Sequence, residues 1–393
     1  MIKCNGDRVR QQICELADIS KTEEGINRLA YSDSFWESNE YIAKLMQEAG
    51  MTVKTNAVGN VVGTYKGKTN SRIVLGSHID SVVNGGMFDG CLGVIGGIEV
   101  VRTLHEKGIT PNHTIDVVAF AEEEGLVIAG LVGSRAYCGL PPTPVMKEKM
   151  QDFGFTEEDF AEAKAEGPLD YSIELHIEQG GVLEQKKLDI GVVSAIVAQK
   201  RFLVEFEGTA NHAGTTPMNL RNDALVKAAK FIQRVEEVAI ETDPIMVGTV
   251  GRILVEPNAM NTVPGKVTMT LELRSLNEES IDIAYNKLMD EFGDKMSSCQ
   301  LTMQQSCYHM DIAVREAIHK ACERLGLSKV DMGSGAGHDS MSLAQATKAG
   351  MIFVPSVEGI SHNKNENTLW EDVTKGTDTL LHTVCVLDEI EVD

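Results

Sequence analysis

Short runs of apolar residues recur along the chain and predict buried strands. They are 72–77 (RIVLGS), 115–121 (IDVVAFA), 171–177 (YSIELHI) and 351–354 (MIFV). Less continuous strand-like segments are 52–53 and 61–65, and helical periodicity marks 7–17, 39–48 and 93–106. Continuous apolar runs that alternate with helices are typical of a parallel sheet covered on both faces. The pattern therefore predicts an α/β domain with a mostly parallel sheet.

The middle of the chain follows a different pattern. Residues 201–207 (RFLVEFE) alternate apolar and polar positions, as a strand with one wet face does. The elements expected after it are helix 223–241, strands 245–255 and 266–273, helix 279–292 and strand 301–305. This β-α-β-β-α-β order is the ferredoxin-like split motif. We interpret 199–308 as a domain inserted into a discontinuous domain made of 1–198 and 309–393.

Charge and composition exclude several classes of partner. The chain has 58 acidic and 36 basic residues and a formal net charge of −22, so it repels nucleic-acid backbones and anionic membrane surfaces. No apolar stretch approaches the ~18 residues of a membrane span, and the first twenty residues resemble no secretory signal. The eight cysteines are scattered without a C-x-x-C pair, which favours reduced thiols and a cytoplasmic location.

Histidines and carboxylates stand just after the predicted strands. The positions are His78, Glu122 to Glu124, His176 and His362, with Asp89 in a loop (GGMFDG) before a helix. In an open parallel sheet the carboxyl ends of the strands face one crevice, so these groups are expected to converge there. Taken singly, each has a plain structural explanation, such as a solvated face for the glutamate run. Their conjunction favours a metal site.

The residue types indicate which ions such a site would hold. Histidines and carboxylates without cysteine suit two divalent ions, zinc first, with manganese and cobalt as alternatives. Two ions that share a carboxylate can activate a water for hydrolysis. His78 and Asp80 lie two residues apart and share one strand face, so Asp80 is expected to accept the other ring N–H of His78 or to fix its neighbours.

Six motifs around these residues resemble those of a known family. They are G-S-H-I-D, G-G-M-F-D-G, E-E-E-G, E-L-H-I-E-Q-G, G-A-G-H-D-S and P-S-V-E-G-I-S-H. They are similar to the motifs of the hydantoinase/carbamoylase amidases. These amidases are a branch of a superfamily of dinuclear-zinc metallopeptidases that also includes aminoacylases and carboxypeptidase G-like enzymes. The likeness runs from about residue 25 to the C-terminus. H-I-E-Q-G and G-A-G-H-D are the pieces that separate this branch from exopeptidases and deacylases.

The resemblance implies roles for individual residues. It implies that Asp89 bridges two metal ions whose remaining ligands are His78, Glu124, His176 and His362. Glu123 would be the general base, directly before the ligand Glu124. The triple glutamate leaves an alternative in which Glu122 is the base and Glu123 the ligand.

It also implies a substrate site with contributions from both domains. Arg274 would grip a substrate carboxylate, although from the sequence alone it could be an ordinary strand arginine. The other positions are His212, which would stabilise the oxyanion and serve the same subunit or its partner, Asn261, Gln179, Gly337 and His338. The inserted domain would act as a lid and as the contact of a homodimer.

The activity implied is hydrolysis of a linear amide C–N bond in a small carboxylate-bearing ureido compound, an N-carbamoyl-L-amino acid first. The alternatives are an allantoate amidohydrolase that releases ammonia, an aminoacylase or dipeptidase, and a non-catalytic binding relative. Two segments depart from the family pattern: Leu126-Val127-Ile128, and the N-K-N-E-N-T run after His362. Both are expected near the mouth of the site, where they would affect the distal half of the substrate.

Overall fold

The chain divides into two compact units. The computed structural model describes residues 2–391. Unit 1 comprises the chain up to Ser194 together with the chain from His309, and unit 2 is Ala195–Tyr308. Each unit has a hydrophobic core of its own.

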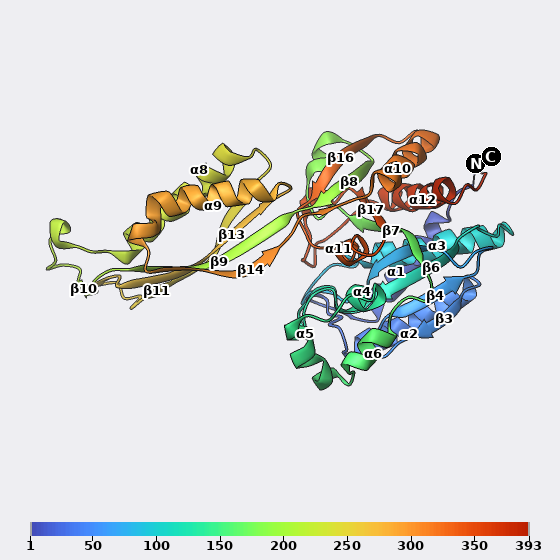
Figure 1. The fold of residues 1–393 in the computed structure, drawn as a ribbon, viewed down its shortest axis with the longest axis horizontal. Coiled ribbons are helices and arrows are strands. Elements are labelled where there is room, and N and C mark those ends of the chain that lie inside the picture. Colours follow the sequence, from blue (N-terminus) through green and yellow to red (C-terminus); the bar gives the residue numbers. More distant parts are fainter. Residues whose placement is uncertain (1, 392–393) are drawn as a thin grey trace. The chain divides into compact units, whose positions relative to one another are not determined.

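A nine-stranded sheet forms the centre of unit 1 (Figure 1). Its order is β15-β8-β17-β7-β5-β6-β4-β3, with β16 beside β8. The strands are β3 (Thr52–Thr55), β4 (Val61–Tyr65), β5 (Arg72–His78), β6 (Thr114–Phe120), β7 (Leu169–Ile177), β8 (Ile190–Ile196), β15 (Tyr308–His309), β16 (Lys329–Ser334) and β17 (Lys348–Val354). The four strands β17, β7, β5 and β6 are mutually parallel. They coincide with the four apolar runs of the sequence.

The flanks of this sheet are antiparallel, so the sheet is mixed rather than mostly parallel. β4 runs antiparallel to β6, β3 to β4, and β8 to β17. The physical reason at one edge is connection length, because only residues 56–60 join β3 to β4. A parallel pair needs a crossover of a dozen residues or more, whereas a short turn imposes a hairpin.

Helices bury the parallel strands. Every residue of β5 and of β6 is buried, as expected of strands covered on both faces. Alternate residues such as Ile73, Leu75 and Val117 join the main core of unit 1. The helices that contribute to this core are α1 (Gly6–Asp18), α2 (Asp33–Glu48), α3 (Cys91–Glu106), α10 (Ile312–Leu325) and α12 (Trp370–Leu387).

Some local structure in unit 1 lies outside the sequence prediction. α2 begins at Asp33, six residues before the expected start at Asn39, because the Ser32 side chain caps it by accepting a hydrogen bond from the Phe35 N–H. Residues 132–162 form the short helices α4 (Val132–Tyr137), α5 (Pro144–Lys149), η1 (Met150–Phe153) and α6 (Glu157–Glu162). These helices surround a small core that includes Phe155 and Phe160.

Unit 2 is a four-stranded antiparallel sheet with two helices on it. The strand order is β11-β13-β9-β14. In chain order the elements are β9 (Ala198–Glu207), α8 (Ala224–Thr242), β11 (Val247–Glu256), β13 (Lys266–Ser275), α9 (Glu278–Phe292) and β14 (Ser298–Gln305). Figure 1 shows α8 and α9 side by side along the sheet. Phe206, Phe231 and Leu288 lie in the core between the sheet and these two helices.

Two features concern the chain as a whole. None of the helices in residues 2–391 combines the length and the apolar character that crossing a bilayer requires. The eight cysteines are all free thiols in the structure.

Candidate metal centre

The strand ends bring the predicted ligands together at one edge of the unit 1 sheet. His78 is the last residue of β5, and His176 lies next to the last residue of β7. Glu123 and Glu124 follow β6, while His362 lies in the loop after β17. Because β5, β6, β7 and β17 are parallel, their carboxyl ends open on the same crevice.

Asp89 lies at the centre of this group. Its Oδ1 is 3.6 Å from Nε2 of His78 and 3.1 Å from Nε2 of His176. Its Oδ2 is 3.3 Å from Nε2 of His362. The two oxygens of one carboxylate therefore face two different histidine sets, which is the geometry that a bridging ligand needs.

The glutamates after β6 divide between these two sets. Glu124 Oε2 is 3.7 Å from Nε2 of His362, and Glu123 Oε2 is 3.8 Å from Nε2 of His78. Glu122 has a different task, because its Oε1 accepts hydrogen bonds from the N–H groups of Val127 and Ile128. Geometry thus favours Glu123 and Glu124, rather than Glu122, as the groups that face the histidines.

These residues fit two metal ions that share Asp89. His78, Asp89 and His176 can each offer an atom to one ion, and Asp89, Glu124 and His362 can do so for a second. Oε1 of Glu124 is buried with no hydrogen-bond partner among the described residues. A buried oxygen without a partner is costly, and a cation would satisfy it.

The two buried histidines are oriented by backbone carbonyls. His78 Nδ1 lies 3.0 Å from the carbonyl oxygen of Asp80, and His176 Nδ1 lies 2.9 Å from that of Ile177. Such partners turn Nε2 toward the ion. Of the two roles expected of the Asp80 carboxylate, the structure shows the second, in which it fixes its neighbours. That carboxylate is 3.7 Å from Nδ1 of His78 and accepts the N–H groups of Glu123 and Glu124.

Residues with a positive φ cluster around the site. Gly90 has a φ of +65°, and a Cβ there would lie 2.6 Å from the ring of His78. Glycine is therefore required directly after Asp89. Gln179 and His362 adopt left-handed φ values of 56° and 51°. Left-handed non-glycine residues cost free energy and cluster at functional sites.

The centre has an excess of negatively charged carboxylates. Burial, together with the negative charge of Asp89, raises the pKa of Glu124 to about 7. Burial also raises the pKa of Glu123 well above its usual value, against the opposing effect of His78. Burial would raise the pKa of Asp89 too, but hydrogen bonds from three histidines hold it well below its usual value. A cluster of buried acids of this kind is stabilised by cations.

The predicted substrate residues of unit 1 lie against the same ligands. Gln179 Nε2 donates a 2.9 Å hydrogen bond to Oδ2 of Asp89. The ring of His338 meets the ring of His176 edge-on, with centroids 4.5 Å apart, and its Nε2 lies 2.8 Å from Ser334 Oγ. Gly337 precedes His338 in the same loop.

The predicted residues of unit 2 occupy two places within that unit. His212 lies on β10 (Asn211–His212), which pairs with β12 (Thr262–Val263), and Ala213 N–H donates to the carbonyl of Asn261. Arg274 lies on β13, where its Nε donates a 2.8 Å hydrogen bond to Glu272. The roles of all three at the metal centre stay predictions.

One residue that holds the centre together was missed by the sequence reasoning. The buried carboxylate of Glu366 accepts hydrogen bonds of 3.1 Å from the N–H groups of Phe88 and Asp89, and one of 2.8 Å from Ser361 Oγ. It lies in the N-K-N-E-N-T run, where an acid among asparagines reads as a solvated loop. Only its position four residues after His362 could have drawn attention to it.

Comparisons with known proteins agree with this geometry. A family model described as Peptidase family M20/M25/M40 matches residues 74–385. The chain belongs to this family. Members are metallohydrolases, which fits the clustered ligands around Asp89.

Relatives extend the likeness over almost the whole chain. The N-carbamoyl-L-amino-acid amidohydrolase of Paenarthrobacter aurescens is 36% identical, and the match covers 98% of this chain and 99% of the relative. The allantoate amidohydrolase of Escherichia coli is 35% identical, over 91% of each chain. Among solved structures, a hydantoinase/carbamoylase family amidase from Burkholderia multivorans is similar, with a TM-score of 0.91, 33% identity and full coverage of both chains.

Proposed function

We propose that this chain is a two-metal amidohydrolase that removes the carbamoyl group from a small N-carbamoyl-L-amino acid. The observation that carries the proposal is the Asp89 carboxylate, whose two oxygens face separate ligand sets. The full-length similarity to an N-carbamoyl-L-amino-acid amidohydrolase supports the substrate class.

Two sets of residues would hold the ions. His78 and His176 would hold one ion together with Asp89, and Glu124 and His362 would hold the other. Imidazole and carboxylate ligands favour zinc, with manganese or cobalt as alternatives. When bound, such ions lower the pKa of a water and polarise the carbonyl group that it attacks.

Glu123 is the residue that we assign to proton transfer. Its carboxylate lies beside His78, and its N–H is fixed by Asp80. It would take the proton of the attacking water and later deliver it to the departing nitrogen, as a general base that becomes a general acid.

The remaining substrate contacts follow the same proposal. Gln179, Gly337 and His338 would line the carbamoyl side. From unit 2, His212 would donate to the oxygen on which negative charge develops, and Asn261 would assist it. Arg274 would hold the substrate carboxylate.

We propose that unit 2 is a lid and dimerisation domain. β11 is an edge strand of its sheet, and its apolar side chains Val247, Ile253 and Leu254 are exposed. An exposed apolar edge strand is suited to pairing with a second copy of the chain. Gel filtration at the mass of a monomer would contradict the dimer.

A substrate panel tests the activity. Metal-reconstituted protein is expected to release ammonia faster from N-carbamoyl-L-amino acids than from allantoate or β-ureido acids, and to release no acetate from N-acetyl amino acids. Allantoate is the second candidate, because the chain is 35% identical to an allantoate amidohydrolase. Faster ammonia release from allantoate would replace the first assignment with the second. Turnover of N-acetyl amino acids alone would overturn both.

Arg274 allows a sharper test of how the substrate carboxylate is bound. Arg274→Lys keeps the charge but loses the planar fork that pairs with a carboxylate through two hydrogen bonds. We expect KM to rise by at least about tenfold, the value of one charge-assisted hydrogen bond, with a smaller change in kcat. Steady-state kinetics with an N-carbamoyl-L-amino acid give both constants.

Arg201 provides the matched control, because its Nε donates a 2.9 Å hydrogen bond to the same Glu272 that Arg274 contacts. Arg201→Lys is expected to leave KM unchanged. If both variants raise KM equally, the effect comes from the ion pairs of Glu272 rather than from substrate binding.

A further inference from the structure

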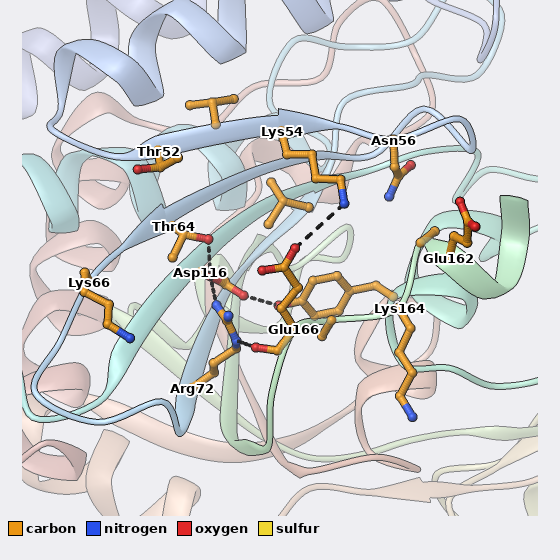
Figure 2. Close-up of a pocket in the computed structure, with 15 residues that line it drawn as sticks. Thr52, Lys54, Asn56, Thr64, Lys66, Arg72, Asp116, Glu162, Lys164 and Glu166 are labelled. Atoms are coloured by element: carbon orange, nitrogen blue, oxygen red, sulfur yellow. Dashed lines mark hydrogen bonds and ion pairs between the residues drawn. The ribbon is translucent and has the colours of Figure 1, made fainter.

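A cavity lies at the opposite end of β5 from the metal centre. It has a volume of about 480 Å³ and is lined by the hairpin of β3 and β4, by the start of β5 and by residues 162–166 (Figure 2). Ligand pockets in proteins have volumes of about 300–1,000 Å³. Arg72 at the cavity and His78 at the metal centre are the two ends of β5, which places the cavity about 20 Å from the metal ligands at ~3.3 Å per residue.

The floor of the cavity is formed by the charged side chains of Arg72 and Asp116, which pair with one another. Asp116 is 1% exposed. Its Oδ1 accepts hydrogen bonds from Arg72 Nη1 at 2.6 Å and from Thr64 Oγ1 at 2.7 Å, and its Oδ2 accepts one from the Tyr137 hydroxyl at 2.6 Å. Arg72 also donates from Nε to the Glu166 carbonyl. Arg72 and Asp116 therefore neutralise each other and form a rigid, polar base.

The rim of the cavity carries an excess of positive charge. Three lysines line it, Lys54, Lys66 and Lys164, against two carboxylates, Glu162 and Glu166. The rim therefore has a local excess of one positive charge, although the chain as a whole has a net charge of −22. An anion of one charge would bring the cavity to neutrality.

The ion pair at the rim of the cavity is easily exchanged, unlike the buried pair of Arg72 and Asp116. Figure 2 shows Lys54 and Glu166 extending toward one another, with 3.7 Å between Nζ and Oε1. Their side chains are 68% and 78% exposed. Exposed pairs of this kind contribute little to stability, so a ligand oxyanion can replace Glu166 beside Lys54 at low cost.

We propose that this cavity binds a small organic anion that carries one carboxylate or phosphate group. Lys54 takes the oxyanion in the place of Glu166, and the Arg72–Asp116 base fixes the shape beneath it. The site is separate from the metal centre, and its occupancy does not depend on metal ions or on the substrate assigned to the enzyme.

Calorimetric titration of the Asp89→Asn variant tests the proposal without interference from anions that bind metal ions. Pyruvate is the carboxylate probe, glycerol 3-phosphate is the phosphate probe, and glycerol is the neutral control. We expect saturable binding of at least one anion and none of glycerol. The two anions distinguish a carboxylate ligand from a phosphate ligand. Absence of saturable binding by either anion overturns the proposal.

Charge-neutral variants then locate the site. The variant Lys54→Gln/Lys66→Gln/Lys164→Gln, made in the same background, is expected to bind the anion at least about tenfold more weakly, because it loses charge-assisted hydrogen bonds. The matched control Lys44→Gln/Lys107→Gln/Lys230→Gln changes three exposed lysines outside the cavity and is expected to bind as tightly as its parent. Equal weakening in both variants would mean that net charge, not the cavity, governs binding.

Discussion

Replacing Glu123 by glutamine is expected to lower kcat by about 10²–10⁴-fold, the usual contribution of a general acid–base residue, while both metal ions stay bound. Glutamine has nearly the same shape but cannot take a proton. The Glu123 N–H, which holds it to Asp80, is unaffected by the change. Steady-state turnover and elemental analysis of the same preparation give the two quantities.

Glu124→Gln provides the contrast within the same loop. Glu124 faces His362, and one of its oxygens is buried without a hydrogen-bond partner, so this variant is expected to lose metal as well as activity. Loss of metal in Glu123→Gln with normal metal in Glu124→Gln would reverse the two assignments. Normal turnover in Glu123→Gln would mean that another group transfers the proton.

Much of the fold could be predicted because the parallel strands are buried on both faces. The runs that became β5 and β6 are mostly apolar, and such runs leave few alternatives. The mixed character of the sheet was harder to foresee. β3 and β4 are short, and their direction depends on a turn rather than on a pattern of side chains. The helices between Val132 and Glu162 have only four to six residues each, too few to show a helical period.

The position of the site followed from topology, whereas its inner contacts did not. Parallel strands predict that His78 and His176 end at one edge, whatever the details of packing. Which atom of Asp80 meets His78 depends on the path of the backbone, and the carbonyl takes the place expected of the carboxylate. Glu366 reaches Asp89 through the fold of a loop that carries no periodic signal.

Asp89→Asn is expected to abolish activity and to remove both metal ions, because Asp89 is the one residue shared by the two ligand sets. Replacing a residue that only hydrogen-bonds to a metal ligand already weakens metal binding by about 10–100-fold. Loss of the shared carboxylate itself should therefore weaken binding of both ions by more than about 100-fold. Elemental analysis after dialysis measures the number of ions per chain.

His362→Asn is the matched single-site variant. The side chain of His362 is half exposed and belongs to only one of the two ligand sets, so its loss should not disturb the fold. It is expected to retain the ion that His78, His176 and Asp89 would hold and to lose the other. The contrast between one ion and none is what a bridging carboxylate requires. If Asp89→Asn keeps one ion while His362→Asn loses two, Asp89 serves a single site, and the two-metal proposal fails.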